Sequence, residues 1–279
     1  MPSRTVILHN HFFKNAGTTI DWALKKNFGE SFVDHRDHVQ MEQGHVYLSN
    51  YLEHNPYIKA LSSHHLAHPL PILPRTDLLQ IIMVRHPIER AVSVYRFERK
   101  QQQSISKGAW HARNSSLPEY IIWRMRSDAG PVIRNFQTRR ALRIHDFSAE
   151  VPLADFLQLA TQFARSVDML GLVDRFDESM VLFEERLAAV FPSIDLSYRI
   201  QNTSGEMPDR PELGFQRWEA EMGEAVHRLL LENNLRDLQL LDVVKEEFET
   251  RLSRVPRLSD KLMNFRNRCV GHLQRLQGT

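Results

Sequence analysis

The chain has 279 residues, of which 42% are hydrophobic and 25% are charged, and its formal net charge is +2. A folded chain of this length buries roughly 75% of the surface that its unfolded form exposes, so it needs neither disulfides nor metals to fold. The composition excludes wholesale disorder, and the near-neutral charge excludes a general polyanion-binding surface. We therefore expect no nucleic-acid partner.

Cysteine use and apolar runs bear on location. The one cysteine, Cys269, cannot form an intrachain disulfide, which fits a reducing compartment. The first apolar run, Thr5–Leu8, is too short for a signal peptide, and no stretch approaches the ~20 apolar residues of a membrane span. We expect a cytoplasmic protein without an integral membrane segment, and the sequence leaves its oligomeric state open.

The first third of the chain alternates predicted strands and helices. A strand is predicted at Val6–Leu8 and a helix through Thr18–Phe28, where apolar residues recur at helical spacing. A second strand is predicted at Ile58–Leu61, and the proline-rich segment Pro69–Pro74 must be a connection. A third strand, Leu78–Val84, is a nearly continuous apolar run, which is typical of a parallel strand buried on both faces.

The rest of the chain is predicted to be mainly helical. A helix begins at Pro87, since the first helical position needs no N–H donor. The middle of the chain, 96–147, is helical and basic, with eleven Lys and Arg against three acidic residues between Arg96 and Arg143. The later predicted elements are a strand at Val167–Leu172 and helices at Asp177–Val190, Trp218–Glu232 and Leu235–Leu252. The alternation of strand and helix indicates an α/β fold with a central, mainly parallel sheet flanked by helices in three layers.

The turn between the first strand and the first helix has the parts of a phosphate cradle. Lys14 supplies a positive charge, Gly17 lets the backbone approach an anion, and Thr18 and Thr19 add hydroxyl donors and can cap the helix. The candidate residues of this loop are Lys14, Asn15, Ala16, Gly17, Thr18 and Thr19. Because the lysine precedes the glycine, the loop departs from the nucleotide-triphosphatase pattern, which disfavours an ATP or GTP kinase. A plain capped helix remains the alternative.

A second candidate anion site follows the third predicted strand. Arg85 lies at its carboxyl end and offers a planar fork to a phosphate, while Ser93 on the next helix can donate a further hydrogen bond. The alternative is that Arg85 pairs with Glu89 and that Ser93 faces solvent.

These two segments resemble the PAPS-dependent sulfotransferases, where PAPS is 3′-phosphoadenosine 5′-phosphosulfate. Residues 13–19, FKNAGTT, look like the 5′-phosphosulfate loop, and residues 83–95, MVRHPIERAVSVY, resemble the 3′-phosphate strand and helix. Residues 135–140 and 169–179 resemble later blocks of the carbohydrate branch, which includes heparan sulfate 2-O-sulfotransferase. The similarity runs intermittently from residue 5 to about 205, and Phe13 replaces a proline that many members have.

The resemblance implies a fold and a set of roles. It implies a P-loop-type three-layer sandwich and one sulfotransferase domain over 1–279, divided into a nucleotide-binding half (5–95), a basic helical insertion (96–147), a segment that completes the sheet and closes over the nucleotide (148–205) and a helical end (206–279). Lys14 would stabilise the departing 5′-phosphate, and Arg85 and Ser93 would hold the 3′-phosphate. Thr203 and Ser204 would touch the adenosine 3′,5′-bisphosphate product, and a simple turn is the alternative there.

The same resemblance places a histidine base after the second strand. Ser63-His64 fits that place, so His64 is the candidate general base, and the neighbouring His65 and His68 remain alternatives. The chain's histidine groups lack the cysteine partners or the H-E-x-x-H spacing of common zinc sites, so no metal is expected.

The acceptor is expected to bear a hydroxyl, and the resemblance favours a carbohydrate or glycoconjugate. The basic segment contains Trp110, Tyr120 and Trp123, which would suit a sugar, although aromatic residues at helical spacing also form cores. Two other functions stay open: a P-loop kinase or other phosphoryl transferase, which would bind ATP with Mg²⁺, and a catalytically silent nucleotide-binding scaffold.

Overall fold

The computed structural model describes residues 4–66, 68–143, 151–199 and 211–277. The chain divides into two compact units. Unit 1 comprises Met1–Val84, Gln158–Asn202 and Val243–Thr279, and unit 2 comprises Arg85–Leu157 and Thr203–Asp242. The predicted contacts of Thr203 and Ser204 lie outside the described residues.

Unit 1 is built on a parallel sheet. Its strands are β1 (Arg4–Asn10), β2 (Phe32–Asp34), β3 (Ala60–Ser63), β4 (Thr76–Val84) and β5 (Met169–Leu172). They follow the order β2-β3-β1-β4-β5, and every pairing is parallel. The centre of the sheet is buried on both faces, which is why β1 and β4 consist of long apolar runs. The predicted α/β class with a parallel sheet is confirmed.

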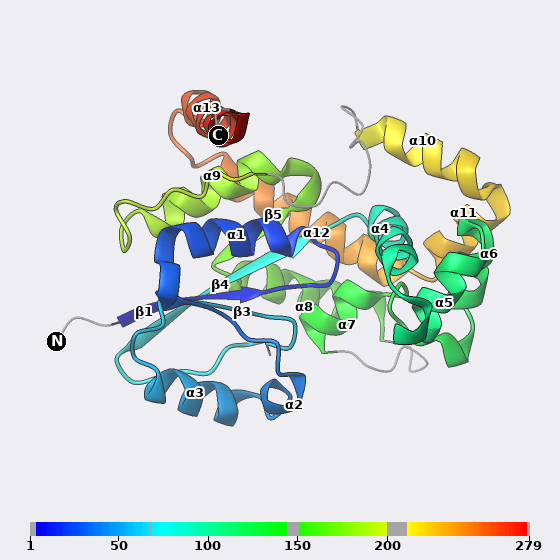
Figure 1. Ribbon diagram of the computed structural model, residues 1–279, viewed down its shortest axis with the longest axis horizontal. Helices are drawn as coiled ribbons and strands as arrows, with labels where there is room; N and C mark the ends of the chain where they lie inside the picture. The colour runs from blue at the N-terminus through cyan, green and yellow to red at the C-terminus, as the bar shows by residue number, and fades with distance from the viewer. Residues whose placement is uncertain (1–3, 67, 144–150, 200–210, 278–279) are drawn as a thin grey trace. The chain divides into compact units, whose positions relative to one another are not determined.

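Helices cover both faces of this sheet, which makes three layers (Figure 1). Figure 1 shows α1 (Gly17–Phe28) and α9 (Phe176–Leu187) on one face and α3 (His45–His54) on the other. On the α3 face, Leu48 and Leu52 pack with strand residues such as Val6 in one apolar cluster. A short helix, α2 (His38–Met41), precedes α3. The three-layer sandwich that the sequence implied is therefore present.

The rest of unit 1 is helical. It includes α13 (Leu258–Gln277) and the ends of two helices that the unit boundary divides, α8 (Leu153–Ser166) and α12 (Leu235–Leu252). Arg251 on α12 donates to the carbonyl oxygens of Ala164 and Val167, at 2.8 and 2.6 Å. A cation at these carbonyls satisfies groups that a helix end leaves unpaired.

Unit 2 is a helical assembly. Its helices are α4 (Pro87–Lys100), α5 (Lys107–Asn114), α6 (Leu117–Arg124), α7 (Phe136–Leu142), α10 (Pro211–Met222) and α11 (Glu224–Glu232). Short 3₁₀ turns complete the two units, at Gly29–Ser31, Gln103–Ile105, Ser127–Ala129 and Val173–Arg175. A buried polar network joins α4 to α6: Arg124 pairs with Glu98 at 2.5 Å, and the Tyr120 hydroxyl donates to Glu98 at 2.6 Å. Both charges are thus paired, as buried charges require.

Most of the predicted elements are confirmed, with small shifts at their ends. The strand predicted at Ile58–Leu61 is observed two residues later, at Ala60–Ser63. The single helix predicted at Trp218–Glu232 is wrong, because Gly223, at φ 79°, separates α10 from α11. Helix α3 was not predicted, since it buries only Leu48 and Leu52 and so lacks a strong apolar stripe.

Across residues 4–66, 68–143, 151–199 and 211–277, no helix is both long enough and apolar enough to cross a membrane.

Candidate active site

The turn from β1 to α1 has a strained backbone held by a buried side chain. Lys14 and Ala16 both have left-handed φ angles, 66° and 60°, which residues other than glycine rarely adopt. Asn15, between them, is buried, and its Nδ2 donates to the carbonyl oxygen of Met83 near the end of β4 at 2.7 Å. Strain of this kind persists only where the surroundings enforce it, and it concentrates at functional sites.

Gly17 is required by a neighbouring ring. A Cβ atom at this position would lie 2.1 Å from Cδ2 of His11, so any side chain would clash with the imidazole. The absent side chain of Gly17 therefore makes room for His11, a reason that the sequence did not reveal.

The first turn of α1 differs from the prediction in one respect. The N-cap residue is Ala16, whose side chain makes no capping bond, and Thr18 and Thr19 lie within the first turn instead of capping it. No acidic residue lies in this turn. Its backbone N–H groups and partial positive charge consequently favour an anion.

A buried cluster of charged and polar side chains lies behind the loop. Asp21 on α1 accepts hydrogen bonds from Nδ1 of His9, at 2.7 Å, and from Nδ1 of His11, at 2.9 Å. Arg36 donates to the same carboxylate at 3.2 Å. Burial acts to raise the pKa of Asp21, but the two imidazoles outweigh it and lower that pKa. Burial also lowers the pKa of His11.

Three side chains of this cluster carry atoms of the kind that bind metal ions. His9, His11 and Asp21 bring three such atoms within 4.8 Å of one another. Both Nδ1 atoms are already at hydrogen-bond distance from the carboxylate, and the Arg36 guanidinium disfavours a second cation beside it. We therefore describe the cluster as a hydrogen-bond network and derive no step through a metal.

His64 lies against this loop. Its Nδ1 donates to the carbonyl oxygen of His11 at 2.6 Å, and the two rings are 4.2 Å apart. A proton on Nδ1 makes Nε2 the basic nitrogen of the neutral ring. The pKa of His64 is lowered to about 4, chiefly by burial and also by the charges of His11 and Arg36, while the hydrogen bond to the His11 carbonyl opposes this shift. The ring is thus neutral at pH 7 and able to accept a proton.

The two alternative histidines have other neighbours. Nδ1 of His65 lies 3.9 Å from Glu42. Nδ1 of His68 lies 2.7 Å from the side-chain oxygen of Gln80, and its Nε2 lies 3.2 Å from Ser166. The hydrogen bond of His64 to the His11 carbonyl places its ring beside the turn between β1 and α1, which favours His64 over the other two.

In unit 2, Arg85 is held at both its backbone and its side chain. The side-chain amide of Gln137 accepts from the Arg85 N–H at 2.8 Å and donates to the Arg85 carbonyl at 2.7 Å. The guanidinium lies 3.4 Å from Glu89, so the pairing weighed in the sequence is observed, although the contact is long. Ser93 is 5% exposed, which overturns the solvent-facing alternative for this residue.

Sequence reasoning missed three residues around these sites: Asp21, Arg90 and Gln137. Arg90 is fully buried, donates to the carbonyl oxygen of Val132 and lies over the ring of Phe136. Burial lowers its pKa to about 10. Arg90 and Gln137 belong to segments that the resemblance singled out, but their roles depend on contacts that spacing does not reveal.

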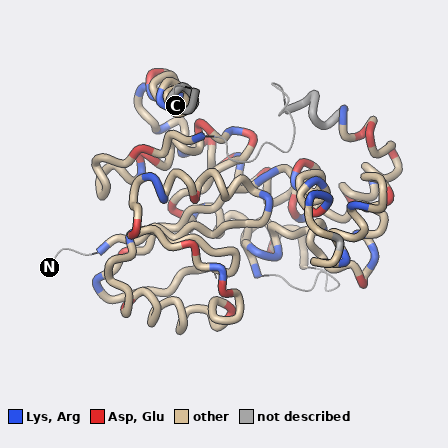
Figure 2. The backbone as a smooth tube through the Cα atoms, in the orientation of Figure 1, with Lys and Arg blue, Asp and Glu red and all other residues tan. Residues whose placement is uncertain are grey.

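The aromatic residues of the basic segment divide into core and surface. Tyr120 is fully buried, which assigns it to the core, whereas Trp110 is 50% exposed. His111 stacks on Trp123 with ring centres 3.9 Å apart. These residues lie on α5 and α6, and Figure 2 marks the Lys and Arg positions along the helices of unit 2. Trp110 thus presents an exposed indole beside the stacked pair, with its ring centre 4.8 Å from that of His111.

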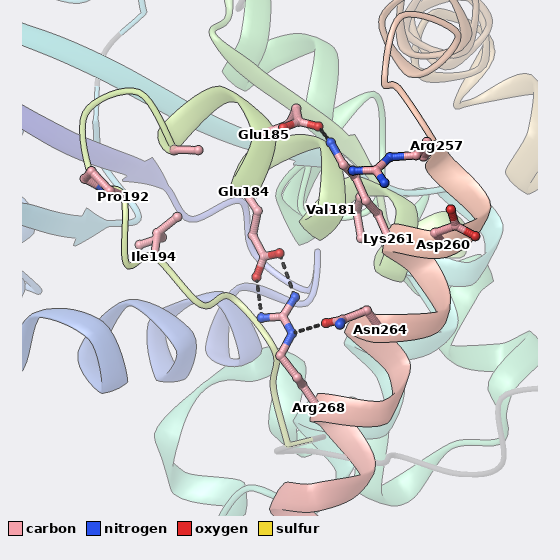
Figure 3. Close-up of a pocket in the computed structure, with 11 residues that line it drawn as sticks. Val181, Glu184, Glu185, Pro192, Ile194, Arg257, Asp260, Lys261, Asn264 and Arg268 are labelled. Atoms are coloured by element: carbon pink, nitrogen blue, oxygen red, sulfur yellow. Dashed lines mark hydrogen bonds and ion pairs between the residues drawn. The ribbon is translucent and has the colours of Figure 1, made fainter.

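A cavity of about 370 Å³ opens in unit 1, lined from α9, from the segment after it and from α13 (Figure 3). Its charged walls are paired internally, as in the contacts of Arg268 with Glu184 and of Lys261 with Glu185. None of the predicted site residues lines it. Arg257 and Asp260 add one charge of each sign to the lining, so the cavity offers no excess of positive charge to an anionic ligand.

Comparison with known proteins identifies the family of this chain. An uncharacterized protein of Archaeoglobus fulgidus is 31% identical over 257 residues, which cover 88% of this chain and 100% of that protein. The family described as "Sulfotransferase family" matches residues 1–242. The chain therefore belongs to the sulfotransferase family.

Proposed function

We propose that the protein transfers a sulfuryl group from PAPS to a hydroxyl of a carbohydrate acceptor. Membership of the family supports a transferase that uses a sulfate donor and a hydroxyl-bearing acceptor. The observation that supports this donor best is the strained Lys14 turn at the acid-free start of α1. A backbone of this kind suits a fixed phosphate, because its N–H groups need no rearrangement when the anion binds.

Lys14 and the start of α1 are proposed to bind the 5′ end of the donor. Thr18, Thr19 and the N–H groups of the loop hold the 5′-phosphate. As the acceptor oxygen bonds to sulfur, the bond from sulfur to the bridging oxygen breaks, and negative charge develops on the departing phosphate. Lys14 stabilises that charge more strongly in the transition state than in the ground state.

Arg85 and Ser93 are proposed to bind the 3′-phosphate. Arg85 provides a bidentate fork, and Glu89, at 3.4 Å, is a weak competitor that the phosphate displaces. Thr203 and Ser204 are proposed to contact the bisphosphate from the segment outside the described residues. This pair of phosphate contacts explains why the donor would be PAPS and not ATP.

His64 is proposed to accept the proton of the attacking hydroxyl. Its proton on Nδ1 faces the His11 carbonyl, so the acceptor's proton goes to Nε2. Replacing His64 with Ala should slow transfer by roughly 10²–10⁴-fold while leaving nucleotide affinity nearly intact. Rapid-quench transfer assays and calorimetry measure the two quantities, and unchanged turnover would assign the base elsewhere.

The proposal also covers the acceptor, the domain organisation and the location of the protein. The exposed Trp110 beside the basic helices favours a carbohydrate acceptor. One sulfotransferase domain over 1–279, with its nucleotide half at 5–95, remains the proposed organisation. A cytoplasmic location is proposed from the one cysteine.

Calorimetry with adenosine 3′,5′-bisphosphate and with ATP and Mg²⁺ tests the donor. We expect the bisphosphate to bind more tightly, whereas tighter ATP binding would favour the phosphoryl transferase. Radiolabelled PAPS incubated with pools of oligosaccharides and other hydroxyl acceptors then tests turnover. Binding without any transfer would favour the silent scaffold.

A further inference from the structure

The peptide of Arg85 is clamped by one side chain. Arg85 is the residue directly after Val84, the last residue of β4 and the last to pair with β5. Beyond the end of this ladder, the amide of Gln137 both accepts from the Arg85 N–H and donates to the Arg85 carbonyl, at 2.8 and 2.7 Å. The side chain thus reproduces the two bonds that a neighbouring strand would make.

The clamp is itself held from α12. Asp237 is fully buried, and its two carboxylate oxygens accept from the backbone N–H groups of Gln137 and Thr138, at 3.1 and 2.7 Å. Asn135 makes further hydrogen bonds at the same junction. Its N–H donates to the side-chain oxygen of Asn234, and its own side-chain oxygen accepts from the N–H groups of Arg236 and Asp237 at the start of α12. The start of α7 therefore has a fixed place against α12.

A second support comes from α4. The buried Arg90 donates to the carbonyl of Val132, and its guanidinium lies 4.3 Å from the ring centre of Phe136, the residue before Gln137. Arg85 and Arg90 flank the start of α4, so the same turn of α7 is attached to this region of the chain at two points. Gln137 is 0% exposed, and water does not compete for its amide.

This arrangement is more specific than core packing requires. Any nearby donor and acceptor could satisfy a buried amide, but Gln137 directs one N–H and its oxygen to the same peptide. Fixing the peptide fixes the Cα–Cβ direction of Arg85, and a bidentate contact with a phosphate depends on that direction.

We propose that Gln137 is a positioning residue for phosphate selectivity: by clamping the Arg85 peptide it aims the Arg85 guanidinium at the 3′-phosphate of the nucleotide. The inference rests on the proposed function, because that function assigns the 3′-phosphate to Arg85.

The test compares two nucleotides that differ by the 3′-phosphate. Calorimetry gives the dissociation constants of adenosine 3′,5′-bisphosphate and adenosine 5′-monophosphate, and their ratio measures selectivity. In Gln137→Met we expect this ratio to fall by about tenfold, the size of one weakened hydrogen bond to a charged group. Binding of the monophosphate should be unchanged. Gln137→Glu, which keeps the shape but opposes a carboxylate to the Arg85 carbonyl, should reduce the ratio similarly and serves if Gln137→Met does not fold.

Two controls separate positioning from loss of stability. Tyr120→Phe removes buried hydrogen bonds of the same unit, far along the chain from Arg85, and should leave the ratio unchanged even if the melting temperature falls. In an Arg85→Ala background, adding Gln137→Met should weaken bisphosphate binding no further, because no guanidinium remains to be aimed.

The outcomes separate a failure of the Arg85 assignment from a failure of the role of Gln137. If the unmodified protein shows no preference for the bisphosphate, the assignment of Arg85 fails and the inference fails with it. If that preference is present and Gln137→Met keeps it, only the role of Gln137 is wrong. The inference is also overturned if Gln137→Met weakens bisphosphate binding equally with and without Arg85.

Discussion

The two candidate anion-binding regions are stabilised by different chemistry. The Lys14 turn is strained and lies against a cluster in which the Asp21 carboxylate holds two imidazoles and a guanidinium. The Arg85 peptide is held by the neutral amide of Gln137. A charged network responds to pH, whereas an amide pair does not titrate. The contacts of the Asp21 cluster should therefore respond to acid, whereas the amide contacts between Gln137 and the Arg85 peptide should not.

Removing Asp21 should have the largest effect. Asp21→Ala leaves two buried imidazole N–H groups without their acceptor, which should cost about 2–5 kcal/mol of the free energy of unfolding. Urea titration measures the loss. Alanine at the exposed Asp174 is the matched control and should change stability by less than about 0.5 kcal/mol.

Lowering the pH should reveal the same contribution of Asp21 to the free energy of unfolding. The pKa of Asp21 is lowered in the folded protein, so its stabilisation is complete above the ordinary carboxyl pKa and disappears as pH falls through the folded value. Below about pH 4, the unmodified protein should lose stability more steeply than Asp21→Ala. Equal slopes would show that the cluster is not held by the ionised carboxylate.

Replacing Lys14 with Ala should have the next largest effect. Loss of a fixed cation at the departing phosphate should lower kcat by roughly 10²–10³-fold. Single-turnover assays with saturating PAPS isolate this step. Lys25→Ala, at an exposed position on α1, is the control, and an equal loss there would remove the special role of Lys14.

Replacing Arg85 with Ala should weaken bisphosphate binding by about 1.5–3 kcal/mol, the range for hydrogen bonds to a charged group. Calorimetry at pH 7 and 8.5, where the phosphate is mainly a dianion, should give a similar loss because the amide of Gln137 does not titrate. Arg113→Ala, an exposed position of the same unit, provides the comparison. Normal bisphosphate binding in Arg85→Ala would move the 3′-phosphate to another residue.

The smallest expected effect is a shift in a pH profile. Because His64 must be neutral to accept a proton and its pKa is lowered to about 4, the acid limb of kcat/KM should lie near pH 4. Arg36 lowers this pKa, so Arg36→Gln should move the limb to higher pH. Circular dichroism at each pH checks that the fold persists. An acid limb near 6.5 would indicate an exposed histidine as the base.

The elements with a strong pattern were predictable, and those stabilised by partners were not. The apolar run of β4 and the proline at the start of α4 identified both correctly. Helix α3 and strand β2 have short or weak apolar patterns, so their stability comes from packing on the sheet. The break at Gly223 divides a stretch whose composition is helical on both sides.

The candidate site was predictable to a similar degree. The sequence pointed to Lys14 and Arg85 because each follows a predicted strand, where parallel sheets present their ligands. It pointed to His64 because the resemblance implies a histidine base after the second strand. It predicted capping by Thr18 and Thr19, which the structure replaces with Ala16 at the N-cap. It favoured His64 as the base but left His65 and His68 as alternatives. The structure places Nδ1 of His65 near Glu42 and the two ring nitrogens of His68 beside Gln80 and Ser166.

The sequence by itself determined the fold class and the order of the loop and the strand end, since hydrophobic periodicity and motif spacing are local properties of the chain. Tertiary structure alone decided that Gly17 makes room for His11, that Asp21 joins two imidazoles and that Gln137 clamps Arg85. The last of these contacts joins residues 52 positions apart. Such a contact depends on the path of the chain between them, which no local pattern specifies.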